Sequence, residues 1–183
     1  MPGLSAVVNR FPIRWLYALG VAACAGGMAF VLYLEHFQGL DPCPMCVFQR
    51  VAMVATGVVF LAGALHAPRG RWAWAYSGLA ALTAGAGAGI AARHVWLQGL
   101  PADQVPACGP TLEYLMDVLP FTEVVRSILR GDGNCAVIDW SFLGLSLPGW
   151  ALVAFTGLAL FALAAPVLAR PAVTSPAVAP KEP

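Results

Sequence analysis

The sequence predicts an all-α membrane protein, in which a four-helix transmembrane bundle carries one long periplasmic loop with short interfacial helices. Three observations predict this class. The 183 residues are 60% hydrophobic and only 10% charged, a composition outside the range of soluble domains. Several uncharged stretches reach the length that a helix needs to cross a bilayer, about 20 residues. Four of the 5 cysteines lie between those stretches, all on one predicted side.

Three of the spans follow from uncharged stretches, at about residues 15–34, 72–92 and 149–168, the last placed after Pro148 and Gly149. The remaining span, at about residues 46–66, reaches membrane length only by including Arg50. An arginine one turn inside a span lies at the interface or has a functional partner. We expect one membrane domain over residues 1–170, followed by a disordered cytoplasmic tail at 171–183.

The basic residues orient these spans in the membrane. Six of the 10 lie on the side of the tight turn between the second and third spans: Arg10, Arg14, Arg69, Arg71, Arg170 and Lys181. Because cytoplasmic loops are enriched in Lys and Arg, this side and both termini are predicted to be cytoplasmic. The loops at about residues 35–45 and 93–148 are then periplasmic. A formal net charge of +1 gives no basis for binding nucleic acid.

The first span has a second interpretation. Arg10 and Arg14 precede an apolar run, and Val21-Ala22-Ala23-Cys24 resembles a lipoprotein cleavage box. The apolar run continues past Cys24 to Leu34, as a span does and a cleaved signal need not. We therefore expect an uncleaved span, in which Cys24 is a small buried residue.

Four cysteines share the oxidising side of the membrane, where disulfides persist. Cys43 and Cys46 lie in the first loop, and Cys108 and Cys135 in the second. Besides a redox function, these four cysteines could form two structural disulfides or a four-thiolate zinc site. Cys108 and Cys135 suit a structural bridge, since closing a long loop removes chain entropy, but they lack the close spacing of zinc ligands. A Cys-x-x-Cys bridge constrains little chain and is more often a redox couple; no metal is expected.

Cys46 is the candidate reactive thiol. Pro42 and Pro44 keep the chain non-helical, so the second span begins near Met45 or Cys46. Unpaired backbone N–H groups and the helix dipole then favour a thiolate at Cys46. Arg50 lies on the same helix face, although a snorkelling arginine is the alternative. Because the sequence has no dinucleotide, haem or metal motif, we expect a lipid-borne quinone to accept the electrons.

The second loop contains apolar residues at helical spacing between its two cysteines. Pro120 divides this segment into two short helices, and Thr122 is expected to cap the second. Such helices lie in the interface plane or, alternatively, face the core of a small outer domain. Residues 131–134 are expected to form a flexible link that lets Cys135 move, whereas Cys108 lies on an extended, accessible strip.

These features resemble the disulfide bond formation protein B (DsbB) family of bacterial inner-membrane thiol:quinone oxidoreductases. The resemblance covers about residues 15–168. It rests on the four-span layout, on the loop that carries the second cysteine pair, and on two motifs. The motifs are Cys43-Pro44-Met45-Cys46 followed by Gln49-Arg50, and Trp140-Ser141-Phe142-Leu143-Gly144-Leu145-Ser146-Leu147-Pro148-Gly149-Trp150.

The resemblance implies an electron relay and its site residues. The implied catalytic cysteines are Cys43, Cys46, Cys108 and Cys135, and the implied quinone-binding residues are Arg50 and His94. A periplasmic thioredoxin-like DsbA-type partner would attack the second-loop disulfide at Cys108. Cys135 would then exchange with Cys43, and electrons would reach ubiquinone or another membrane quinone through Cys46. For His94, the alternative is an ordinary polar residue at the interface.

Two other functions compete with this relay. The chain could be a membrane reductant that runs electrons outward, or a non-catalytic scaffold with two stapled loops. A reductant usually needs cysteines inside its spans or facing the cytoplasm, and only Cys24 meets that condition. Bound quinone and quinone-dependent oxidation of a dithiol protein would separate the three functions.

Overall fold

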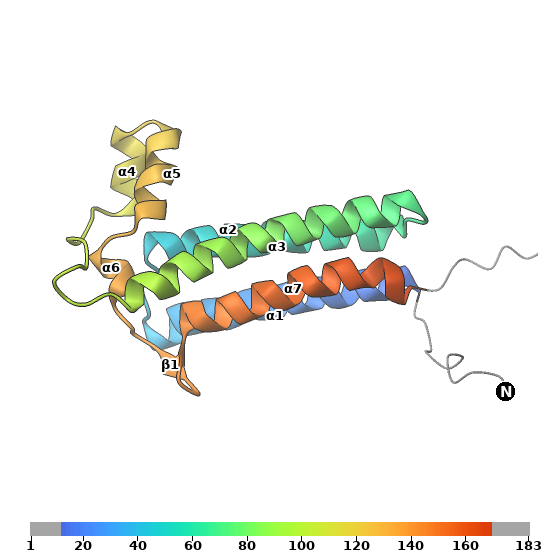
Figure 1. Cartoon of the computed structure of the whole chain (residues 1–183), viewed down its shortest axis with the longest axis horizontal. Helices are drawn as coiled ribbons and strands as arrows, with labels where there is room; N and C mark the ends of the chain where they lie inside the picture. Colours follow the sequence, from blue (N-terminus) through green and yellow to red (C-terminus); the bar gives the residue numbers. More distant parts are fainter. Residues whose placement is uncertain (1–11, 170–183) are drawn as a thin grey trace, which may run out of the picture.

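The computed structural model describes residues 12–169, and four long helices dominate this part of the chain. The helices are α1 (Ile13–Gln38), α2 (Pro44–His66), α3 (Arg71–Gln98) and α7 (Leu147–Leu168). They run side by side along the long axis of the molecule (Figure 1). Each is long and apolar enough to cross a membrane, so the predicted helical membrane bundle is confirmed. Arg10, Arg170, Lys181 and the tail predicted at 171–183 lie outside the described residues.

The third long helix ends later than predicted. It continues from residue 92 through Arg93 and His94 to Gln98. The sequence prediction stopped at the first charged residue, but Arg93 is accommodated beyond the span. Its guanidinium donates to the carbonyl oxygens of Leu129 and Arg130 at 3.2 and 2.9 Å. The helix therefore continues for six residues, about 1.7 turns, beyond its uncharged segment.

The last long helix begins earlier than predicted, at Leu147 rather than residue 149. Pro148 lies in its first turn, where a missing N–H costs no helical hydrogen bond. Ser146 precedes the helix, and its side chain accepts the N–H of Gly149 at 3.4 Å. Pro148 and Gly149 thus belong to the helix start and not to the loop before it.

Small residues allow the long helices to approach one another closely. A Cβ at Gly87 of α3 would lie 2.4 Å from the Phe155 ring of α7, and one at Gly63 of α2 would lie 2.8 Å from the Tyr17 ring of α1. The Tyr17 hydroxyl also donates to the carbonyl oxygen of Ala73 on α3 at 2.8 Å. Close contacts through small residues and interhelical hydrogen bonds stabilise bundles in lipid, where burial from water contributes little.

The loops that carry the cysteines gather at one end of the bundle, opposite the turn between α2 and α3 (Figure 1). We call this end, with residues 39–43 and 99–146, the cysteine end. It contains three short helices, α4 (Leu112–Val118), α5 (Phe121–Arg130) and α6 (Gly133–Ala136), and an antiparallel hairpin of β1 (Ser141–Phe142) and β2 (Leu145–Ser146). All of these elements lie in the longer of the two loops, at about residues 93–148, that the sequence predicted to be on one side of the membrane.

The short helices α4 and α5 are divided at Pro120, as predicted, but Thr122 is not the cap of α5. The helix begins at Phe121, with Pro120 in the capping position. The fixed φ of proline already suits a helix start, so Thr122 lies inside the first turn.

The apolar face of α5 packs onto the cysteine end of the bundle and forms a second core. Val124 and Ile128 are buried there, in a cluster with Leu97 of α3 and Met45 of α2. This arrangement matches the alternative in which the short helices face a small outer core. Tyr114 of α4 and Phe121 at the start of α5 remain exposed.

Candidate active site

The start of α2 brings the first cysteine pair together. Cys43 precedes the helix in extended backbone, with Pro44 at its first position, and Cys46 lies in the first turn. The helix start thus agrees with the prediction to within two residues. The Cys43 thiol donates to Cys46 Sγ at 3.3 Å. Because the first turn also offers unpaired backbone N–H groups, Cys46 is the sulfur better placed to carry negative charge.

His94 reaches this pair from the last part of α3. Its side chain is only 2% exposed, and Nε2 lies 3.8 Å from Cys43 Sγ. The other ring nitrogen, Nδ1, lies 3.1 Å from Nε2 of the buried Gln49. His94 is therefore buried beside the first cysteine pair, while its role toward a quinone stays a prediction. Gln49 was part of the motif but had no predicted role; its position three residues after Cys46, on the same helix face, is the signal that points to it.

Cys43, Cys46 and His94 also form a group of potential metal ligands. Their ligand atoms all lie within 4.8 Å of one another, and thiolate sulfur and imidazole nitrogen are donors that zinc prefers. This group differs from the four-thiolate site considered from the sequence, because it contains His94 and neither Cys108 nor Cys135. The closeness of the two thiols also suits a redox couple that forms and breaks a disulfide.

Cys135 approaches the first pair from the second loop. It is 1% exposed and lies in α6, where the Asp132 side chain accepts its backbone N–H at 3.3 Å. Hydrogen bonding with the Cys43 thiol, and then burial, raise the pKa of the Cys135 thiol. The flexible link expected at residues 131–134 is instead partly an ordered, capped helical turn, because Asp132 satisfies the N–H that the start of α6 leaves free.

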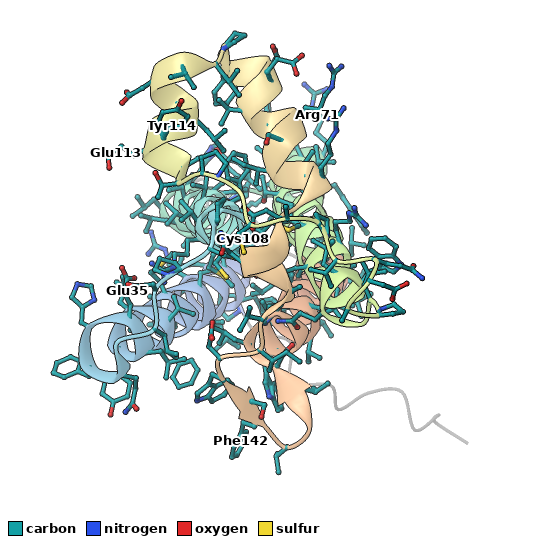
Figure 2. All side chains as sticks on the ribbon, turned by 90° about the vertical axis from the view of Figure 1, so that its left-hand side faces the viewer. Glu35, Arg71, Cys108, Glu113, Tyr114 and Phe142 are labelled. Carbon is teal, nitrogen blue, oxygen red and sulfur yellow. The ribbon has the colours of Figure 1, made fainter. Side chains whose placement is uncertain are left out.

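Cys108 has the opposite environment and is exposed. Figure 2 looks onto the cysteine end and shows Cys108 at the centre of this face. The strip that carries it runs beside the start of α6, since the Gly133 N–H donates to the Ala107 carbonyl oxygen at 3.2 Å. A Cβ at Gly133 would lie 3.2 Å from Cys108 Sγ. The predicted exposure of Cys108 is thus present, and its loop lies close to the segment that carries Cys135.

Arg50 forms an ion pair that links α2 to α1. Its Nη1 atom donates to Oε2 of Glu35, and the two side chains are 21% and 28% exposed. The guanidinium is therefore paired with a carboxylate on the neighbouring helix, unlike a snorkelling arginine. The sequence analysis missed Glu35, although an acidic residue directly after an uncharged span is a signal that could have identified it.

A cavity of about 800 Å³ joins the first cysteine pair, His94, Arg50 and Glu35, and its volume is typical of small-molecule sites. Cys46, Arg50 and His94 contribute polar atoms to its wall, and α1, α2 and α7 contribute mostly apolar side chains. Three aromatic side chains from the second predicted motif also line it: Trp140, Phe142 and Trp150. Trp140 packs edge-on against Phe30 of α1 with ring centroids 5.8 Å apart. The cavity can hold an apolar ring compound with its polar atoms toward the first cysteine pair.

Comparisons with known proteins point to one family. The sequence model described as disulfide bond formation protein DsbB matches residues 13–165. Disulfide bond formation protein B from Hahella chejuensis is 52% identical over 144 residues, which cover 79% of this chain and 87% of the relative. The protein of the same name from Nitrosococcus oceani is 48% identical over 151 residues, covering 82% and 89%. That from Xanthomonas campestris pv. campestris is 50% identical over 154 residues, covering 81% and 90%.

Proposed function

Because the chain belongs to the disulfide bond formation protein DsbB family, we propose that it is a thiol:quinone oxidoreductase of the bacterial inner membrane. In this function it reoxidises a periplasmic DsbA-type dithiol protein and passes the electrons to ubiquinone or another membrane quinone. The family supports a disulfide oxidoreductase in a multi-pass membrane protein. The choice of partner, the quinone acceptor and the orientation of the chain are our proposals.

One observation carries the quinone proposal. The first cysteine pair borders a largely apolar cavity whose wall also includes the Arg50 guanidinium and the His94 imidazole. The donor set fits a quinone, whose ring is apolar and whose carbonyl oxygens need hydrogen-bond donors. When bound, a quinone takes up two electrons and two protons. Arg50 can donate to an oxygen on which negative charge develops, and His94 can hold or supply a proton near Cys43.

The four cysteines divide the proposed reaction into balanced exchanges. A partner thiolate attacks Cys108 of the Cys108–Cys135 disulfide, which releases Cys135 as a thiolate; the second partner thiol then releases Cys108 and leaves the partner oxidised. Cys135 attacks Cys43 of the Cys43–Cys46 disulfide and releases the Cys46 thiolate. Attack of Cys108 on Cys135 restores the second disulfide and leaves Cys43 and Cys46 as a dithiol. Its oxidation releases the two electrons and two protons that the quinone accepts.

The proposed orientation places the cysteine end in the periplasm and both termini in the cytoplasm. The basic turn between α2 and α3, which contains Arg69 and Arg71, supports this orientation. Fusions of alkaline phosphatase should be active when joined near Cys108 and inactive when joined near Arg69. The reverse pattern would contradict the orientation without changing the fold.

The purified protein in detergent tests the function directly. We expect it to oxidise a reduced thioredoxin-fold dithiol protein only when a soluble quinone is added, with one quinone consumed per disulfide formed. Anaerobic reaction mixtures exclude oxygen as the acceptor. Oxidation that does not depend on quinone, or no oxidation at all, would contradict the proposed function, and the second outcome would favour the scaffold alternative.

A further inference from the structure

The Arg50–Glu35 ion pair lies in the wall of the cavity. Both side chains line the cavity that Cys46 also lines, although they come from different helices. The pair therefore joins α1 and α2 at the polar part of the cavity wall. No other ion pair among residues 12–169 joins two of the long helices.

Glu35 is not in a place that stabilises its own helix. It lies in the last turn of α1, which ends at Gln38. The C-terminal end of a helix carries partial negative charge, so a carboxylate is unfavourable there. A carboxylate beside an apolar cavity also loses solvation. Its interaction with Arg50 offsets both effects, which indicates that the carboxylate is oriented by the arginine and the arginine by the carboxylate.

Arg50 keeps donors available beyond this interaction. A guanidinium has five N–H donors in a fixed plane, and the hydrogen bond to Glu35 uses Nη1. Because the guanidinium is planar, the hydrogen bond at one edge also sets the directions of the remaining N–H donors. Without a partner, an arginine side chain has considerable rotational freedom, and near a span end it extends toward the headgroups.

We propose that Glu35 is a positioning residue that holds the Arg50 guanidinium toward the cavity beside Cys46, in the orientation in which it donates to a quinone oxygen. This inference rests on the proposed function. Glu35 does not touch the reacting sulfur atoms; it acts through Arg50. Its loss should therefore weaken quinone use and leave exchange between Cys108 and the partner protein intact.

Two substitutions of Glu35 separate its role as a hydrogen-bond acceptor for Arg50 from the effect of its negative charge. Glu35→Ala removes the acceptor altogether and should raise the KM for quinone about tenfold, the effect of losing one charge-assisted hydrogen bond. Glu35→Gln keeps an oxygen that accepts from Arg50 and should raise the KM by less. Asp103→Asn is the charge control, because Asp103 is an exposed carboxylate of the second loop that does not line the cavity; the KM of this variant for quinone should equal that of the wild type.

A double-substitution cycle with Arg50→Gln tests the mechanism. Arg50→Gln alone should raise the KM for quinone at least as much as Glu35→Ala, and Glu35→Ala should add little in the Arg50→Gln background, because there is no guanidinium left to orient. Equal effects of Glu35→Ala in both backgrounds, or an unchanged KM, would overturn the inference.

Controls keep this result distinct from a failure of folding or of the proposed function. Each variant should carry out a single exchange of the Cys108–Cys135 disulfide with the dithiol partner at the wild-type rate. A variant that loses this exchange is misfolded, and Glu35→Gln then decides the question. If the wild type itself shows no quinone-dependent turnover, the proposed function fails; if it turns over and the KM of Glu35→Ala is unchanged, only the role of Glu35 fails.

Discussion

The two cysteine pairs are built differently. Cys43 and Cys46 lie three residues apart at one helix start, both partly buried, with their sulfur atoms 3.3 Å apart. In the second pair, Cys108 is exposed while Cys135 is buried against Cys43. The first pair is a single unit that borders the cavity. The second is divided between a thiol that faces outward and one that faces the first pair.

This difference between the pairs suggests how one chain could exchange electrons with both a protein and a small molecule. A protein partner needs an accessible sulfur, since attack on a disulfide requires approach in line with the bond. A quinone needs a dry cavity instead. In the proposed function the two conditions fall to different pairs, and Cys135, which is buried against Cys43, would connect them.

The largest effects are expected from replacing the cysteines themselves. Cys108→Ser should abolish oxidation of the protein partner, because the exposed sulfur is gone, but added quinone should still oxidise Cys43 and Cys46. Cys46→Ser should abolish oxidation by quinone. Thiol trapping followed by mass spectrometry reports the redox state of each pair.

The combination of results decides whether the two pairs act in sequence. Normal partner oxidation by Cys108→Ser would contradict the division of roles. So would quinone-dependent turnover by Cys46→Ser.

The sequence predicted the local features of the site well. The start of α2 follows from the prolines, and the placement of Arg50 one turn after Cys46 follows from helical periodicity. These features depend on residues close together in the chain. The end of α3 was predicted too early because a charge was taken as the limit of the helix, although Arg93 finds its hydrogen-bond partners in α5.

The contacts between elements could not be predicted. His94 and Gln49 are 45 positions apart, and Glu35 and Arg50 are 15 apart. Each contact depends on the rotation and depth of two packed helices, which composition and spacing do not specify. The approach of Cys135 to Cys43 likewise depends on the second core, through which α5 packs onto the bundle.

The next largest effect should come from loosening that packing. Gly131 has φ +78°, and a Cβ there would lie 2.2 Å from Leu97 Cδ1. Gly131→Ala should shift the segment that carries Cys135 and slow its exchange with Cys43 several-fold, mainly because the added Cβ would overlap Leu97. The backbone at Gly131, with φ 78° and ψ 163°, adds strain of about 1–3 kcal/mol for a residue other than glycine. Rapid thiol trapping after mixing with reduced partner measures this step.

Gly144→Ala is the matched control for Gly131→Ala. Gly144 has a similar φ, +80°, but a Cβ would meet nothing within 4 Å, and it lies in the hairpin turn. This variant should exchange at the wild-type rate. Equal slowing in both variants would mean that backbone strain, and not the contact with Leu97, governs the exchange.

A smaller effect concerns the pH at which Cys135 reacts. Hydrogen bonding with Cys43 is the main cause of its raised pKa, so Cys43→Ala should lower this pKa and shift alkylation of Cys135 in the reduced protein to lower pH. Cys46→Ala keeps Cys43 and should leave the midpoint near that of the wild type. The alkylation rate of the Cys135 peptide as a function of pH gives the midpoint. Identical midpoints in wild type and Cys43→Ala would contradict the role of Cys43.

The smallest effect is expected at the fifth cysteine. Cys24 is a buried thiol like Cys135, at 4% exposure, but it lies within α1 and packs against Gly57 of α2, where a Cβ would come within 3.2 Å of Cys24 Cβ. It has the same chemistry as the other four and none of their surroundings. Cys24→Ala should therefore leave quinone-dependent turnover unchanged.

The cost of Cys24→Ala should appear only in stability, at about 1 kcal/mol for a small buried side chain, as a shorter half-life on heating. Because α1 also carries Glu35, turnover after mild heating must be compared at equal folded fraction. A loss of turnover at full folding would mean that a thiol inside the bundle takes part in electron transfer. The outward-running reductant would then become the better explanation, since only Cys24 lies where such a reductant needs a cysteine.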